Sequence, residues 1–274
     1  MKKIAILLMI VSALFGATPE QVERYLLISG SEDQLIEFEQ MIDGMSQMLA
    51  AKDGQDVPLM QDSQMVPIRF REYLQRNLSE SEMQEVLDNY KHDVLRKLVS
   101  AEVLMEEPDT RESYRQFKAR IQTDPLPTGR TETVKAIIKK LYDEKLLVEF
   151  FDKMFLPMVK QMGSTDGKPI PEDRVKKIGE NFVKKMQKSN EQAMLFMTRD
   201  FSDEELEELD DLSGSSATSH ETRAVFGAIV SAMGEAMDNM AKRFGRMVKN
   251  RNHPPLRASK ETNKTAMHEG NVTR

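Results

Sequence analysis

The chain has 274 residues, enough for one large or two small domains with a substantial apolar core. It contains no Cys, which excludes disulfides, thiolate metal sites and cysteine nucleophiles. Aromatic residues make up only 6%, Trp is absent and there are 20 Met, so most apolar side chains are aliphatic or thioether groups. Such side chains fit between helices, and no segment alternates apolar and polar residues as a strand does. We therefore predict an all-α helical bundle.

Residues 1–17 have the layout of a secretory signal peptide. Lys2 and Lys3 precede an apolar run from Ile4 to Phe15, and the small residues Gly16 and Ala17 follow. This run falls well short of the roughly 20 apolar residues that span a bilayer, so we expect no stable membrane insertion once the segment is removed. The sequence does not distinguish cleavage after Gly16 from cleavage after Ala17. The prediction is a periplasmic protein of a Gram-negative bacterium.

The charge is unevenly distributed along the chain. The formal net charge is −6, and it becomes −8 without Lys2 and Lys3. From Lys242 to the C-terminus, 9 basic and 2 acidic residues give +7, which leaves the rest of the chain near −15. An acidic body speaks against nucleic-acid binding. Residues 249–274 also lack apolar periodicity, so we expect a disordered basic tail there.

Capping signals divide the first part of the chain into helices. Thr18 precedes Pro19 and has Gln21 three residues later, a pattern typical of an N-cap, a first helical residue and a capping box. Gly30 ends this short helix, and Ser31 begins the next one. The apolar residues of that next helix recur every three or four positions, at Leu35, Phe38, Ile42, Met45 and Leu49.

The strongest helix start in the first half is at Ser79. Ser79 and Glu82 form a capping box, and Leu78 and Met83 flank it as a hydrophobic staple. The other expected elements of this region are a loop over 52–63, a helix over about 67–77, a continuous helix from Ser79 to about Leu104 and a helix over 110–121.

The segment 124–129, Asp-Pro-Leu-Pro-Thr-Gly, is the best domain boundary because two prolines and a glycine do not continue a helix. A similar series of elements begins after it. The expected elements are a helix over 131–142, a helix that contains Leu147 to Phe150 and is kinked by Pro157, a loop over 163–171 and a long helix from Pro171 to about Met197.

A second strong helix start follows at Ser202, where Glu205 completes a capping box and Phe201 and Leu206 form the staple. Gly214 should end this helix. A polar hinge over 213–219, a further capping box of Thr218 and Glu221, and a final helix that reaches about Met247 are expected after it.

The two halves resemble each other. The capping boxes at Ser79 and Ser202 are 123 positions apart, and Leu35 to Phe38 is echoed 112 positions later. We therefore predict two related helical units, residues 18–124 and 125–248. The alternative is that amphipathic helices simply look alike.

The run Phe201-Ser-Asp-Glu-Glu-Leu, followed by a short helix, a hinge and an amphipathic helix, resembles a bacterial exported family, domain of unknown function 2059. That family has a signal peptide and a late Phe-Thr-Glu-Glu-Glu-Leu segment before a Phe-Tyr-x-Ser-Pro-x-Gly turn. In this chain Leu212 and Ser213 replace Phe and Tyr, and Ser215 matches the Ser. Ser216 and Thr218 stand in place of the Pro and the Gly. The resemblance implies an all-helical periplasmic domain and brings no activity.

No group of residues forms a recognisable catalytic or metal site. His92, His220, His253 and His268 have no ligand partners at zinc spacing. His220 lies near several Ser without the Gly-x-Ser-x-Gly pattern of a nucleophile. The acidic run from Glu204 to Asp211 is interpreted as the solvated face of a helix rather than a Ca²⁺ loop.

Met residues spaced three or four apart supply a candidate binding surface, and the basic tail could also contact anionic envelope surfaces or merely aid solubility. Thioethers can bind Cu(I), but these positions coincide with the apolar stripes of their helices, which favours core packing or an adaptable groove. We predict a non-enzymatic interaction or scaffold module that binds apolar segments of envelope proteins, without a cofactor. The alternative is an enzyme or copper carrier with a site assembled from distant residues, and the oligomeric state is open. The candidate groove residues are Met154, Met158, Met233, Met237 and Met240.

Overall fold

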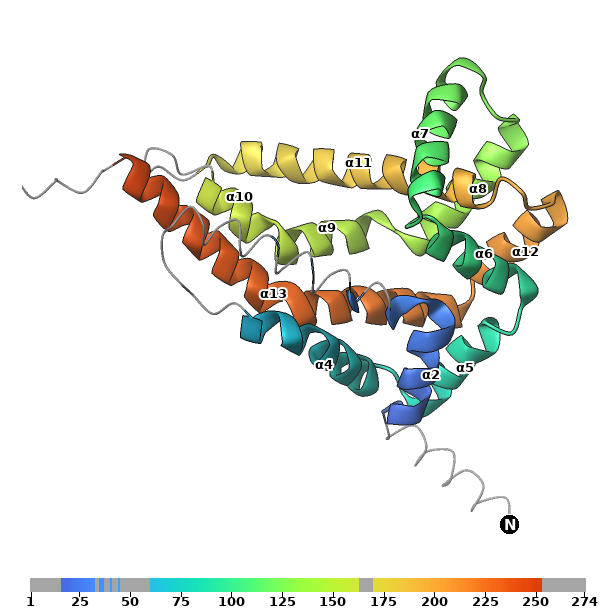
Figure 1. The fold of residues 1–274 in the computed structure, drawn as a ribbon, viewed down its shortest axis with the longest axis horizontal. Coiled ribbons are helices and arrows are strands. Elements are labelled where there is room, and N and C mark those ends of the chain that lie inside the picture. Colours follow the sequence, from blue (N-terminus) through green and yellow to red (C-terminus); the bar gives the residue numbers. More distant parts are fainter. Residues whose placement is uncertain are drawn as a thin grey trace, which may run out of the picture.

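The chain folds as an all-α helical bundle (Figure 1). The structure is a computed structural model that describes residues 16–32, 35–36, 40, 44, 60–162 and 170–252, without the side chains of 60–64, 161–162, 236, 240 and 243–252. The predicted signal segment before Gly16, most of the helix expected after Ser31 and residues 253–274 of the predicted tail lie outside these residues. The expected tail start at residue 249 is wrong, because residues 249–252 still belong to the last helix.

The structure describes the following helices in chain order. They are α2 (Pro19–Ser29), α4 (Met60–Asn77), α5 (Glu80–Asn89), α6 (Asp93–Leu104), α7 (Pro108–Thr123), α8 (Thr128–Leu141), α9 (Glu144–Met154), α10 (Leu156–Met162), α11 (Glu172–Met197), α12 (Asp203–Ser213) and α13 (Ser216–Asn252). Among them, none combines the length and apolar character needed to cross a bilayer.

Three predicted capping boxes are confirmed. Thr18, Ser79 and Ser202 each accept a hydrogen bond from the backbone N–H three residues later, and the side chain at that position bonds back to the cap. The staple residues of the last two boxes are buried on both sides of the cap. These helix starts are therefore fixed by residues within a few positions of one another.

The predicted helix ends at Gly30, 124–129 and Gly214 are confirmed. Gly30 has φ of 72°, a left-handed conformation that costs a glycine little. The helix that contains Phe150 stops at Met154, and α10 begins just before Pro157, so the proline falls at the expected interruption.

Three predicted boundaries are wrong. The helix from Ser79 does not continue to Leu104, because a turn separates α5 from α6. Helix α4 begins at Met60, seven residues before Pro67, which lies inside it. The polar hinge is shorter than 213–219, since α13 already begins at Ser216, and its cap is Ser215, which accepts from the Thr218 N–H.

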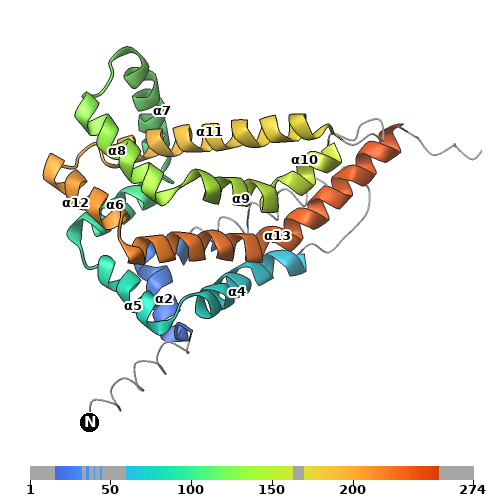
Figure 2. The same ribbon diagram turned by 180° about the vertical axis from the view of Figure 1, so that it is seen from behind.

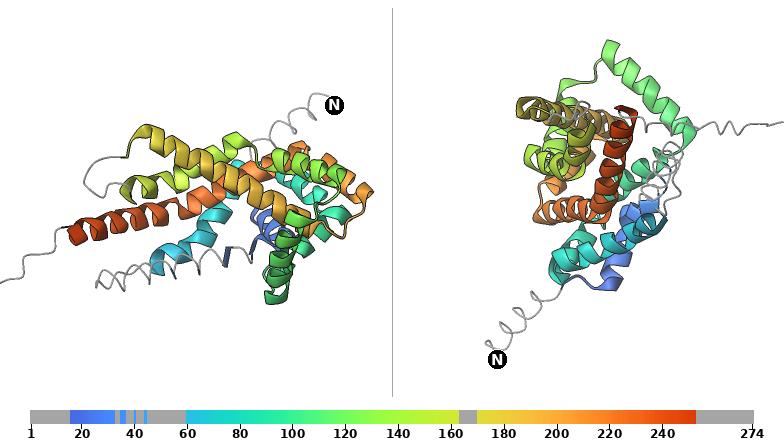
Figure 3. Two further views of the ribbon diagram at one scale, coloured as in Figure 1. Left: turned by 90° about the horizontal axis from the view of Figure 1, so that it is seen from above. Right: turned by 90° about the vertical axis from the view of Figure 1, so that its left-hand side faces the viewer.

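Helix α13 forms the centre of the bundle. It packs along α4 on one side and against α9 and α10 on the other, and α11 covers the outer side of α9 and α10. The order α4, α13, α9–α10, α11 is visible from both sides and end-on (Figures 2 and 3). Helices α7, α8 and α12 gather at the end of the bundle where α13 starts.

The packing does not follow the predicted boundary at 124. One buried cluster combines α2, α4 and α5 with Met154 of α9 and a row of residues on α13. The other combines Val94 of α6 and Phe117 of α7 with residues of α8, α11 and α12. Each cluster therefore contains residues from both predicted units, and the units do not form separate cores.

Each of the two predicted units packs one of its helices against the other unit. Helix α13 packs on α4 and α5 of the first unit, whereas α6 packs on α11 and α12 of the second. Lys97 on α6 pairs with Glu205 at 2.7 Å, and His220 on α13 faces Glu82 at 3.4 Å. Lys97 and His220 are 123 positions apart, as are Glu82 and Glu205. This reciprocity is what a duplication would produce, although common ancestry of the units stays a prediction.

Candidate functional site

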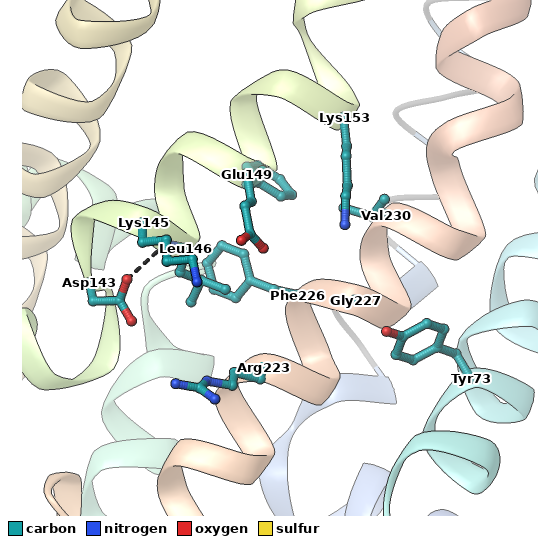
Figure 4. A pocket seen from close by; sticks show the side chains of 11 residues that line it. Tyr73, Asp143, Lys145, Leu146, Glu149, Lys153, Arg223, Phe226, Gly227 and Val230 are labelled. Atoms are coloured by element: carbon teal, nitrogen blue, oxygen red, sulfur yellow. Dashed lines mark hydrogen bonds between the residues drawn. The ribbon is translucent and has the colours of Figure 1, made fainter.

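A pocket of about 250 Å³ lies between α9 and α13, beside α4 (Figure 4). We call it the α9–α13 pocket. Its apolar side is formed by Leu146, Phe150, Phe226 and Val230. The rings of Phe150 and Phe226 meet edge to face with centroids 5.2 Å apart, which holds both rings in place.

The rim of the α9–α13 pocket carries three cations. Lys145 and Lys153 extend from α9, and Arg223 lies across from them on α13 (Figure 4). Within the described part of the chain, none of the three has an ion pair or a hydrogen bond through its charged group. Glu149 lies between the lysines, and Asp143 caps α9 by accepting from the Leu146 N–H at 2.8 Å. The lining therefore carries one net positive charge.

Gly227 determines how closely α4 and α13 approach at this pocket. A Cβ atom on Gly227 would lie 2.2 Å from the Tyr73 hydroxyl oxygen and 2.5 Å from its Cζ. The aromatic ring of Tyr73 therefore rests directly on the backbone of α13. Tyr73 and Arg223 also line a smaller hollow with His220 and Glu82.

A larger pocket of about 600 Å³ lies among α2, α6, α8 and α11. We call it the α6–α11 pocket. Apolar residues form much of its wall, among them Ile138, Met194 and Met197, and the lining residues Ile36 and Val103 are 47% and 49% exposed.

The charged residues that line the α6–α11 pocket are all acidic. They are Glu102, Glu106 and Glu107, and no Lys or Arg is found among the described lining residues. Arg111 lies just outside and pairs with Glu106. The pocket therefore combines an apolar wall with an edge of net negative charge.

A carboxylate is enclosed near the start of α13. The hydroxyls of Tyr25 and Tyr90 both donate to one oxygen of Glu221. Burial raises the pKa of the Glu221 carboxyl from 4.5 to about 6, although both tyrosine hydroxyls oppose the shift. Burial and the Glu221 charge raise the pKa of both tyrosines. Glu221 is thus not the capping-box residue that its spacing from Thr218 predicted.

The candidate groove residues lie together, but mostly inside the protein. Met154, Met233 and Met237 are no more than 5% exposed, and Met158 packs against the same cluster. The side chain of Met240 is outside the described residues. These three buried residues therefore do not line an open groove, because α9, α10 and α13 pack directly on one another there.

The two described histidines, His92 and His220, and the acidic run make surface ion pairs, and His253 and His268 lie outside the described residues. His92 is 2.8 Å from Glu208, Lys97 binds Glu205, and Lys140 binds Asp210. The Ser215 hydroxyl contacts Thr218 and Asn89 rather than His220. Within the described ranges, no three His, Asp or Glu side chains are grouped so that they could hold a metal ion.

Sequence reasoning missed both pockets. Lys145, Glu149 and Lys153 do recur every four residues, which places them on one face of α9. The spacing gives no indication that Arg223 and Tyr73 approach this face, because they lie on helices far away in the chain. In the same way, Glu102, Glu106 and Glu107 read as ordinary surface residues.

Comparisons with known proteins found no match: no family model, no curated protein and no solved structure resembles the chain significantly. The resemblance to domain of unknown function 2059 therefore stays a prediction.

Proposed function

We propose that this chain is a non-enzymatic interaction module of the cell envelope that holds an apolar segment of a partner protein in the α6–α11 pocket. The observation that supports this function is the pocket itself, about 600 Å³ in volume. Concave pockets of about this volume with apolar walls are typical of ligand-binding sites in proteins. The predicted role is kept, but its site moves from the buried methionines to this pocket.

The chemistry of the pocket selects one class of partner. Ile36 and Val103 present apolar surface that a partner's aliphatic side chains would cover. The acidic edge favours a Lys or Arg next to those side chains, and it disfavours an acidic segment. The occupant that fits best is therefore a basic amphipathic segment, with its apolar face toward Val103 and its cations toward Glu106 and Glu107.

Binding of a designed peptide tests this function. A fluorescent 15-residue helical peptide of Leu and Lys should bind the full chain at least about tenfold more tightly than the same peptide with Glu in place of Lys, as measured by fluorescence anisotropy. Ala193 lines the pocket on α11, so Ala193→Phe should fill part of it and weaken Lys-peptide binding by about tenfold or more.

The matched control is Ser189→Phe, which adds the same ring to an exposed position of α11. It should leave the affinity unchanged. Equal binding of the Lys and Glu peptides, or an Ala193→Phe protein that binds like the wild type, would show that the pocket does not have this role.

We also propose that the chain is exported, and the packing of Ala17 at the beginning of the fold provides a test. Ala17 is buried, and its N–H donates to the Leu78 carbonyl at 2.8 Å. Cleavage after Gly16 retains this residue, whereas cleavage after Ala17 removes it. Intact-mass analysis of protein released by osmotic shock should therefore find a chain that begins at Ala17. A full-length chain retained in the inner membrane would contradict export, and a chain that begins at Thr18 would contradict a need for Ala17.

A further inference from the structure

We propose that the α9–α13 pocket binds an amphiphilic monoanion, with an acidic group at Arg223 and an apolar body against Phe150, Phe226 and Val230. This site is at a different place from the α6–α11 pocket and takes a ligand of opposite charge. The inference does not depend on the proposed function.

The first support is the set of cations around the pocket. Some surface cations of this protein are paired, as Arg76 is with Glu72 and Lys135 with Glu132. Lys145, Lys153 and Arg223 surround one hollow, and within the described residues none of them makes such a pair. The Tyr73 hydroxyl is a further hydrogen-bond donor on the same lining, and it too bonds to no described residue.

The second support is the apolar wall directly beside these donors. Phe226 and Val230 lie one and two helical turns after Arg223 on the same side of α13. A ligand that binds its acidic group at Arg223 can therefore lay a ring or short chain along α13 against Phe150. Removing that surface from water adds to the affinity, and a simple inorganic anion gains nothing from it.

The charge of the ligand follows from Glu149. This carboxylate points into the pocket between Lys145 and Lys153 (Figure 4). Together with Asp143 it balances two of the three cations, so the site favours one negative charge and repels a second. Carboxylic acids and phosphodiester headgroups both meet this description, and a volume of about 250 Å³ accommodates one headgroup and part of its apolar body.

Calorimetry with naphthalene-2-carboxylate on the full chain tests the site. We expect binding of the carboxylate at least about tenfold tighter than that of the neutral naphthalene-2-carboxamide. Arg223→Gln should weaken carboxylate binding about tenfold, whereas Glu149→Gln should strengthen it, because it removes the repelling charge. Lys184→Gln changes an exposed lysine on α11 and should have no effect.

A second arm of the experiment distinguishes the source of the anion. Flotation with phosphatidylglycerol vesicles, and with phosphatidylcholine vesicles as the control, tests a lipid headgroup. If the protein binds vesicles through Arg223 and does not bind the free acid, the ligand is a lipid. If it binds the free acid through Arg223 and does not bind vesicles, the ligand is a free acid. If neither probe binds, or if Arg223→Gln and Lys184→Gln behave alike with both, the proposal is wrong.

Discussion

Gly227→Ala should lower the free energy of unfolding by about 1–3 kcal/mol, the usual range for overpacking a tightly packed contact. The new methyl group would lie within 2.6 Å of three atoms of the Tyr73 side chain, so the ring or one of the two helices has to move. The better helix propensity of Ala recovers no more than about 1 kcal/mol of this loss. Chemical denaturation at neutral pH measures the change.

The chain contains a matched control two turns later on the same helix. A Cβ on Gly234 meets no atom of another described element within 4 Å, so Gly234→Ala should stabilise the protein by up to about 1 kcal/mol. In a Tyr73→Ala background, Gly227→Ala should also become stabilising, because the clash is gone. Destabilisation of equal size at both glycines, or no rescue by Tyr73→Ala, would mean that α4 and α13 do not approach closely here.

Glu221→Gln should change the pH dependence of stability by about 2 kcal/mol between pH 4.5 and pH 7. The carboxyl pKa is about 6 in the folded chain against 4.5 for the free group, so the folded state binds the proton more tightly. Stability is therefore lost as the pH rises through this window, by about 1.4 kcal/mol for each pKa unit. A neutral Gln removes this loss while its carbonyl oxygen still accepts from a tyrosine hydroxyl.

Denaturation at pH 4.5 and at pH 7.5 measures this difference. The two tyrosines that donate to Glu221 stay neutral throughout this window, because the pKa values of Tyr25 and Tyr90 are raised well above 10. Glu102 on α6 contributes a charge that raises the Glu221 pKa further. Exposed Glu85→Gln on α5 is the control and should keep the wild-type pH dependence. Identical curves for the wild type and Glu221→Gln would refute the enclosed carboxylate.

Local signals were predictable from the sequence, and this explains why the helix starts were correct. A capping box at Ser79 or Ser202 involves residues three positions apart, so its geometry is determined before the chain folds further. The break between α5 and α6 has no Gly or Pro to mark it. It is held instead by contacts from distant residues, such as Asn89 with Ser215 and His92 with Glu208.

The sites could not be predicted because their residues are brought together only by tertiary packing. Tyr25 and Glu221 are 196 positions apart, and Tyr90 and Glu221 are 131 positions apart. The apolar stripe of α13 predicts that one face is buried, but not which helices cover it. For the same reason the spacing of Met233 and Met237 does not distinguish a core from an open groove.

The packing of α13 on helices of the first unit has a consequence for the order in which the protein folds. The apolar faces of α4 and α5 are covered by α13, which is the last described helix to be synthesised. Contacts so distant in sequence form slowly, and a chain emerging N-terminus first leaves these faces exposed until its final helix arrives. The core of the first half therefore stays incomplete until α13 is synthesised. We expect the protein to fold as one cooperative unit rather than one half after the other.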